Sequence, residues 1–144
     1  MNDNTLLQAD RPDPGWGDQD RPQKAIAIFT TLRLMTGLDF SNSHWLDIGC
    51  GCGEIAAHLA PQVGRITAID PSPWQRWYKL NSTHPNLEFV RGDYTGDYPA
   101  PNSIDVVVCN QVYEHVPDAE ALIGFIHRIL KPGGYAYFAG PNLL

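Results

Sequence analysis

Short apolar runs alternate with segments of helical spacing along most of this chain, and this alternation is its most restrictive feature. Five of the runs predict β-strands, over His44–Ile48, Arg65–Ile69, Leu87–Val90, Ile104–Cys109 and Tyr135–Ala139. The segments between them predict helices, over Glu54–Ala60, Pro73–Leu80 with Ser72 as N-cap, and Asp118–Leu130. Such alternation requires right-handed crossovers, so the sequence predicts an α/β fold with a doubly wound, mainly parallel sheet of about five strands.

The segment before the first predicted strand divides near residue 20. Residues 1–20 are rich in Asp, Pro, Gly and Gln and show no periodicity, which predicts a flexible N-terminal arm around Trp16. A helix is predicted from Arg21, because Pro22 suits a first turn and Gly37 supplies a stop. Its predicted apolar face comprises Ile26, Phe29, Leu32 and Met35. Residues 21–144 are predicted to form one domain, since 144 residues are too few for a second domain of ordinary size.

The composition excludes several classes of partner. An apolar fraction of 43% predicts a soluble globular protein, and no apolar run reaches the ~18 residues that suggest a membrane span. A formal net charge of −6 with only ten Lys and Arg argues against a nucleic-acid partner. The first residues lack the features of a signal peptide, so we expect a cytoplasmic protein. No metal site is expected at Cys50 and Cys52, because no second pair of cysteines accompanies them.

A glycine-rich loop, Gly49-Cys50-Gly51-Cys52-Gly53, joins the first predicted strand to its helix. Closely spaced glycines let a ligand approach the backbone where a Cβ would collide. A dinucleotide fingerprint would place a third glycine at position 54, whereas Glu54 puts a carboxylate where it would repel a pyrophosphate. The loop therefore favours a ligand without phosphates, with a tight turn that binds no ligand as the alternative.

Asp70 ends the second predicted strand, 17 residues after Gly53. At this position a carboxylate can accept both hydroxyl protons of a ribose, as in dinucleotide folds. The alternative is a turn residue before Pro71. The aromatic residues of the following helix are expected to pack in the core; they are Trp74, Trp77 and Tyr78.

Polar residues also follow the third and the fourth predicted strands. Gly92-Asp93-Tyr94 follows the third, where the carboxylate can accept from an exocyclic amine or can simply lie in a surface turn. A polar run from Asn110 to His115 leaves the apolar fourth strand at the predicted switch point of the sheet. Ligands of doubly wound folds bind at this point, so the run is expected to be functional.

Together these residues resemble the motif series of the class I S-adenosylmethionine-dependent methyltransferases, and especially the small-molecule group that includes ubiquinone and menaquinone C-methyltransferases. The matching segments are Trp45–Gly53, Ile69–Ser72, Arg91–Pro99, Asn102–Val107, Tyr113–Asp118 and Leu130–Gly134. The resemblance covers residues 45–140. It implies a Rossmann-like fold, S-adenosylmethionine as cofactor, and methyl transfer to a small-molecule acceptor.

The resemblance also implies roles for individual residues. Asp47 would help to hold the glycine loop and the methionine amine, and Asp70 would take the ribose hydroxyls. Asp93 would accept from the adenine amine with Tyr94 beside the ring. The implied cofactor-binding residues are Asp47, Gly49, Cys50, Gly51, Asp70, Pro71, Gly92, Asp93, Tyr94, Asn110, Gln111 and Val112. A cationic cofactor without phosphates suits this acidic set.

His115 is the predicted catalytic residue. Imidazole titrates near neutral pH, so this side chain could serve as general base for a hydroxyl or amine acceptor. The alternative is that no base is needed, because methyl transfer is an in-line displacement on an activated sulfonium. Proximity and orientation alone can supply most of its acceleration.

The sequence ends just after the fifth predicted strand, whereas members of this family usually continue with a helix and two further strands. Without them, Tyr135–Ala139 is expected to be an unprotected apolar edge that a second copy, a missing C-terminal segment or the N-terminal arm must cover. Two functions stay open: a small-molecule methyltransferase, or a truncated or non-catalytic cofactor-binding module. Nucleotide-sugar and NAD-dependent redox chemistry are disfavoured by Glu54 and by the lack of a Tyr-x-x-x-Lys pair.

Overall fold

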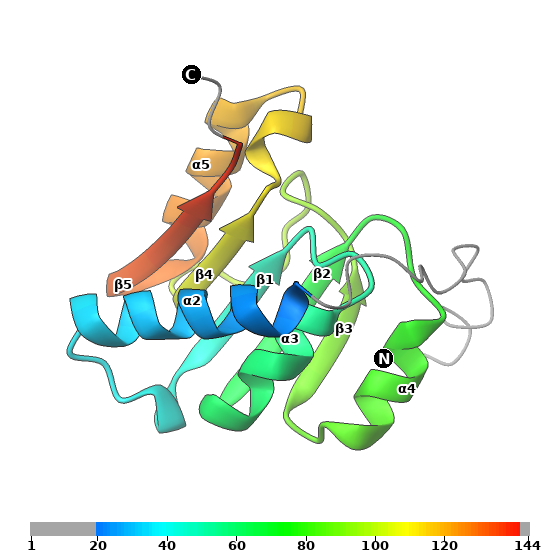
Figure 1. The fold of residues 1–144 in the computed structure, drawn as a ribbon. Coiled ribbons are helices and arrows are strands. Elements are labelled where there is room, and N and C mark those ends of the chain that lie inside the picture. The colour runs from blue at the N-terminus through cyan, green and yellow to red at the C-terminus, as the bar shows by residue number, and fades with distance from the viewer. Residues whose placement is uncertain (1–19, 142–144) are drawn as a thin grey trace.

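The computed structural model describes residues 20–141, in which five strands form one sheet of order β3-β2-β1-β4-β5 (Figure 1). The strands are β1 (His44–Ile48), β2 (Arg65–Asp70), β3 (Leu87–Arg91), β4 (Ile104–Asn110) and β5 (Leu130–Ala139). Every neighbouring pair is parallel, which confirms the predicted sheet. The predicted arm at residues 1–20, with Trp16, lies outside the described residues except for its last residue.

Helices cover both faces of this sheet. They are α2 (Arg21–Met35), α3 (Glu54–Leu59), α4 (Arg76–Thr83) and α5 (Ala119–Ile129), with 3-10 turns η1 (Phe40–Asn42), η2 (Ala60–Gln62) and η3 (Tyr113–His115). Side chains of α2, α3 and α4 share one apolar core with the sheet, and those of α5 share a second core on the other face. In β4, Val106 and Val108 face the first core and Val107 the second, so its apolar run is uninterrupted.

The strand order reverses between β1 and β4. Leu46 of β1 pairs with Thr67 of β2 on one side and with Val107 of β4 on the other. The chain runs outward from β1 through β2 to β3, and then returns to begin β4 on the opposite side. The carboxyl ends of β1 and β4 therefore form the switch point at which ligands of doubly wound folds bind.

The buried face of α2 agrees with the predicted one only in part. Leu32 is buried and Phe29 packs against the core as predicted, whereas Ile26 and Met35 are 65% and 76% exposed and Ala25 and Ile28 are buried instead. Apolar side chains surround this helix almost evenly, so their spacing does not single out one face. Packing against α3 decided the orientation.

Several element boundaries also differ from the predictions, most clearly at α4 and at the junction of α5 and β5. The helix predicted from Pro73 begins at Arg76, and Ser72 is not its N-cap, because the Ser72 N–H donates to Asp70 Oδ1 at 2.9 Å in a turn before the helix. Helix α5 ends one residue early, since Leu130 already pairs with Ile104 and begins β5 five residues before its predicted start. Of the three aromatic residues expected in the core, Trp77 is fully buried, Trp74 is partly buried and packs against the core, and Tyr78 is 64% exposed.

Strand β5 forms one edge of the sheet within the described range. Its side chains are mostly exposed, with Tyr135 at 40% and Phe138 at 43%. The expectation of an apolar edge at 135–139 is confirmed for this part of the chain.

Candidate functional site

The glycine loop after β1 makes two close approaches that only glycine allows. A Cβ on Gly49 (φ +67°) would lie 2.7 Å from Val112 Cγ2, and a Cβ on Gly53 (φ +90°) would overlap the ring of Phe89. Both φ values belong to the left-handed region that glycine adopts without strain. The loops after β1 and β4 are therefore in contact at the switch point, through Gly49 and Val112.

Asp70 at the end of β2 is held in place by the loop beside it. Its Oδ2 accepts the Gly51 N–H at 3.0 Å, and its Oδ1 accepts the Ser72 N–H at 2.9 Å. A carboxylate offers about four lone-pair sites, so both oxygens can accept a further bond. Asp70 is thus oriented by the backbone and still able to bind hydroxyl groups.

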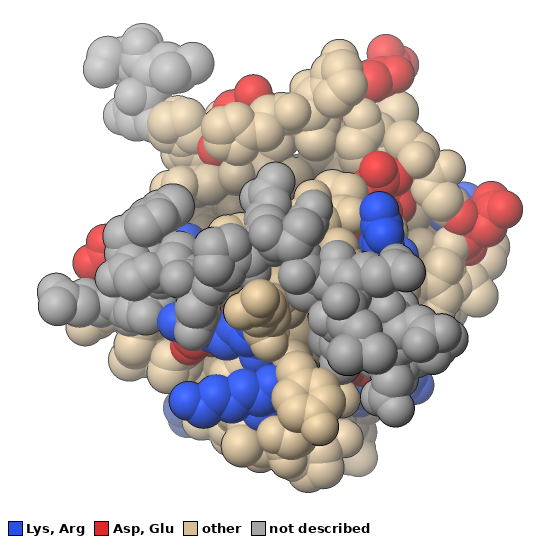
Figure 2. All heavy atoms as spheres, turned by 90° about the vertical axis from the view of Figure 1, so that its right-hand side faces the viewer, with Lys and Arg blue, Asp and Glu red and all other residues tan. Residues whose placement is uncertain are grey.

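A cavity of about 680 Å³ opens at the carboxyl ends of the strands. Its lining includes nine of the predicted site residues, namely Gly49, Asp70, Pro71, Gly92, Asp93, Tyr94, Gln111, Val112 and His115. They come from four separate stretches of sequence and meet here because parallel strands end at the same edge. Most of the Asp and Glu side chains visible in Figure 2 lie in its upper half, toward which the strands' carboxyl ends point.

A second cavity of about 400 Å³ lies on the other side of the glycine loop. Gly49 and Gln111 line both cavities, so the two meet at the switch point. The predicted residues Cys50, Gly51 and Asn110 line only this one. The last predicted residue, Asp47, lines neither cavity and is 3% exposed in β1 below the loop.

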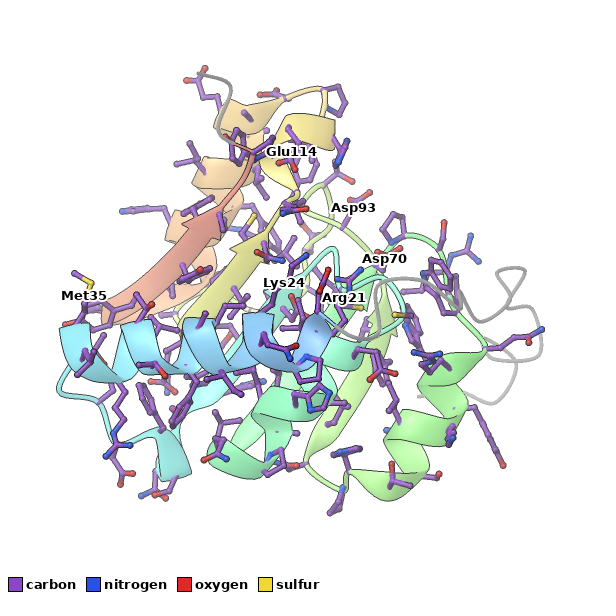
Figure 3. All side chains as sticks on the ribbon, viewed as in Figure 1. Arg21, Lys24, Met35, Asp70, Asp93 and Glu114 are labelled. Carbon is purple, nitrogen blue, oxygen red and sulfur yellow. The ribbon has the colours of Figure 1, made fainter. Side chains whose placement is uncertain are left out.

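Two basic residues that the sequence analysis did not select also line the second cavity. They are Arg21 and Lys24, at the start of α2 (Figure 3). The Arg21 Nε is buried with no hydrogen-bond partner among the described residues. The first turn of a helix disfavours positive charge, so two basic residues without an acidic one there were a signal of function in the sequence.

Gln111 takes a backbone conformation that is rare for its residue type. Its φ is +56°, and its N–H donates to the Ala139 carbonyl at 2.6 Å. Such positions cost of order 1–3 kcal/mol and cluster at functional sites. The strain falls on a residue that lines both cavities.

Asp93 and His115 both line the larger cavity. The Asp93 Oδ1 accepts the Thr95 N–H at 2.8 Å, which fixes the carboxylate after β3. The His115 ring is 77% exposed, and its Nε2 lies 3.7 Å from Oε1 of Glu114. Because this imidazole is exposed and also lines the cavity, it can contact a molecule that enters from solvent.

The cysteines of the loop are buried thiols. Burial raises the pKa of both Cys50 and Cys52, so the thiolate form is disfavoured. Within residues 20–141 no group of three or more His, Cys, Asp or Glu side chains could hold a metal ion. In the same range no helix has the length and apolar character needed to cross a membrane.

Asp47 gives the structure a pH-dependent stability. Burial raises its pKa to about 7, with Asp70 adding to the rise and Arg21 opposing it. The pKa of Asp47 in the folded state lies above the unfolded value of 3.8, so between pH 3.8 and about 7 the folded state binds more protons than the unfolded state. The free energy of unfolding therefore falls as pH rises from about 4 to about 7. A shift of about three pKa units corresponds to a loss of at most about 4 kcal/mol in the free energy of unfolding.

We expect Asp47→Asn, which is neutral at every pH, to remove this loss. Urea unfolding of both proteins at several pH values between 4 and 8 measures it. The stability of the variant relative to the native chain should increase with pH, and a difference that stays constant would contradict the assignment.

Comparisons with known proteins bear on this site. The model of a family described as methyltransferase domain matches residues 19–143. A ubiquinone biosynthesis O-methyltransferase of Xanthomonas euvesicatoria pv. vesicatoria is 35% identical over 136 residues, which cover 88% of this chain and 56% of the relative. The chain thus spans about half the length of the curated relatives it matches.

Solved structures agree with this match. The 1,6-didemethyltoxoflavin-N1-methyltransferase of Burkholderia thailandensis, with bound 1,6-didemethyltoxoflavin and S-adenosylhomocysteine, superposes with a TM-score of 0.68 at 25% identity over 83% of this chain and 52% of that one. Phosphoethanolamine N-methyltransferase 2 of Haemonchus contortus, in complex with S-adenosyl-L-methionine, superposes with a TM-score of 0.67 at 26% identity. The match covers 78% of this chain and 26% of that one. The resemblance seen in the motifs is confirmed, and the chain belongs to the class I S-adenosylmethionine-dependent methyltransferases.

Proposed function

We propose that this chain binds S-adenosylmethionine across its two adjoining cavities and that the protein transfers the methyl group to a small-molecule acceptor. The observation that carries the proposal is the junction of the cavities at Gly49 and Gln111. The larger cavity is lined by the carboxylates of Asp70 and Asp93, and the smaller one by the basic side chains of Arg21 and Lys24 together with Asp20. This division matches a ligand with a nucleoside at one end and an amino acid at the other.

The larger cavity suits the adenosyl part. Asp70 is positioned to accept from the ribose hydroxyls, because both of its oxygens are already aligned by backbone donors. Asp93 can accept from the adenine amine, with Tyr94 and Pro71 along the ring and Gly92 leaving room beside it. Hydroxyl and amine donors would meet the carboxylates of Asp70 and Asp93 in an otherwise largely apolar lining.

The smaller cavity suits the methionine part. Arg21 and Lys24 can pair with its carboxylate, and the buried Arg21 Nε that lacks a partner among the described residues fits an acceptor oxygen. The backbone of Gly49, Cys50 and Gly51 can cradle the chain, and Asp47 below the loop favours the nearby amine through its charge. Binding a cation would favour the carboxylate form of Asp47 over the protonated form.

When bound, the cofactor supplies a methyl group on an activated sulfonium. Asn110, Gln111 and Val112 line the cavities at and beside their junction, where they can hold the sulfonium and the acceptor in the geometry for reaction. His115 stands at the open side of the larger cavity and can take a proton from a hydroxyl or amine acceptor.

We further propose that the apolar edge at Tyr135 to Ala139 is covered in the assembled protein, by a second copy of the chain or by a further segment of a longer polypeptide. Its aromatic side chains and unpaired backbone groups within the described range support this. A cytoplasmic location, with small molecules as partners, fits the composition.

Two measurements test the proposed function with the 144-residue chain. Calorimetric titration with S-adenosylhomocysteine should show binding at a single site, and incubation with methyl-labelled cofactor and a panel of phenols, amines and quinone precursors should show transfer. Failure to bind S-adenosylhomocysteine would overturn the proposal. Binding without transfer to any acceptor would instead favour the second candidate, a cofactor-binding module.

A further inference from the structure

Gly51 lies at the apex of the glycine loop, and its conformation is not fixed by packing. A Cβ built on Gly51 (φ +55°) would meet no atom within 4 Å, whereas Gly49 and Gly53 are confined by Val112 and Phe89. Glycine has the largest conformational freedom of any residue. Hydrogen bonds must therefore hold the Gly51 backbone in the conformation that lines the smaller cavity.

Asp70 and Trp77 make the two close bonds, and the Cys50 thiol adds a weak donor contact to the Gly51 carbonyl at 3.7 Å. Asp70 accepts the Gly51 N–H at 3.0 Å, and the indole Nε1–H of Trp77 donates to the Gly51 carbonyl at 2.7 Å. The peptide groups before and after Gly51 are thus both fixed. Because Asp70 is itself oriented by the Gly51 N–H, a change at the carbonyl side would also disturb the carboxylate.

The indole is a rigid donor. Trp77 has no exposed surface, and its ring stacks on Phe89 with centroids 5.0 Å apart and an interplanar angle of 11°. The same Phe89 ring confines Gly53. Arg76, which precedes Trp77 in α4, also joins this helix to the start of α3 through a 2.6 Å ion pair with Glu54. Helix α4 therefore holds the loop at its apex and at its end.

We propose that Trp77 is a positioning residue for the cofactor, acting through its indole N–H on Gly51 and hence on Asp70. It contacts no ligand in this scheme. Its N–H keeps the loop in the binding conformation before the cofactor arrives, so the ordering cost is met on folding rather than on binding. This inference rests on the proposed function, since it assigns a role within the same site.

The test is Trp77→Phe, which keeps an aromatic ring against Phe89 and removes the N–H donor. The chain offers a matched control in Trp45, which is also fully buried and donates its Nε1–H at 2.7 Å to Ser43 Oγ at the opposite end of the sheet. Both variants lose one indole hydrogen bond of 2.7 Å and a similar ring volume. Only the first touches the loop.

We expect Trp77→Phe to weaken S-adenosylhomocysteine binding by about three- to tenfold, the range of one neutral hydrogen bond. We expect Trp45→Phe to leave the affinity unchanged at a comparable loss in Tm. The Gly51 amide should also exchange faster with solvent deuterium in Trp77→Phe alone. Equal affinities of the native chain and Trp77→Phe, or equal losses in both variants, would overturn the inference.

A second replacement keeps the test decisive if Trp77→Phe does not fold. Site-specific incorporation of benzothienylalanine at position 77 retains the bicyclic ring and replaces the N–H by sulfur, so packing is preserved and only the donor is lost. The same weakening is expected. If the native chain itself fails to bind S-adenosylhomocysteine, the proposed function fails; if it binds and this variant binds equally well, only the role of Trp77 fails.

Discussion

Asp70→Asn is expected to weaken S-adenosylhomocysteine binding on the order of 100-fold. In the native chain the carboxylate accepts backbone N–H groups from Gly51 and Ser72, and we propose that it also accepts the ribose hydroxyls. The amide of an asparagine has only one acceptor oxygen, so its NH₂ group would face one of the two backbone N–H donors, and the negative charge of the carboxylate would be lost. Two hydrogen bonds to a charged group at roughly 1.5 kcal/mol each correspond to about this factor.

Asp105→Asn is the matched control for this experiment. Asp105 is also a strand aspartate whose carboxylate accepts a backbone N–H, from His44 at 2.8 Å, but it lies at the amino end of β4. Titration calorimetry on the native chain and both variants should show the loss in Asp70→Asn alone. If Asp70→Asn binds as the native chain does, the ribose assignment is wrong; an equal loss in the control would mean that the effect is a general one on folding.

Gly53→Ala is expected to have the largest effect on stability, a loss of about 2–5 kcal/mol. The new Cβ would overlap the Phe89 ring, which is fully buried and stacked on Trp77 and so has little room to move. Overpacking of this kind costs ~1–3 kcal/mol, and a non-glycine residue in the left-handed region costs roughly 1–2 kcal/mol more. Chemical denaturation followed by circular dichroism measures the loss.

Gly51→Ala separates these two contributions. Its φ is also positive, at +55°, but a Cβ there meets nothing within 4 Å, so only the backbone cost applies. We expect Gly51→Ala to lose about half as much stability as Gly53→Ala. Phe89→Leu should lower the free energy of unfolding less in the Gly53→Ala variant than in the native chain, because the smaller side chain relieves the overlap with the new Cβ. Full additivity of the two substitutions would show that Phe89 is not the cause.

Much of the fold followed from local signals in the sequence. The five strands were predicted because each is a short apolar run bounded by Gly, Pro or polar residues, and β4 was placed correctly by its unbroken valines. The boundaries at Arg76 and Leu130 were missed. The first depends on the Asp70 side chain forming a turn, and the second depends on pairing with Ile104 in a strand far away in sequence.

The candidate site divides in the same way. Gly49, Asp70, Asp93 and Gln111 could be selected because each lies within three residues of the end of a predicted strand, and parallel strands bring their carboxyl ends to one edge. Arg21 and Lys24 precede Gly49 by more than twenty residues and reach the loop only through the packing of α2 against α3. No spacing rule in the sequence relates them to the site.

The sequence by itself determined the order of the elements, the glycine loop and the acidic residues after β2 and β3, because apolar periodicity and backbone requirements act over a few neighbouring residues. Only the tertiary structure decided which face of α2 is buried, that two basic residues line the smaller cavity, and that the Trp77 indole donates to Gly51 rather than only filling space. These depend on where rigid elements meet after packing. A hydrogen bond requires its two atoms within about 3 Å, and that condition is set by the whole fold and not by the residues on either side.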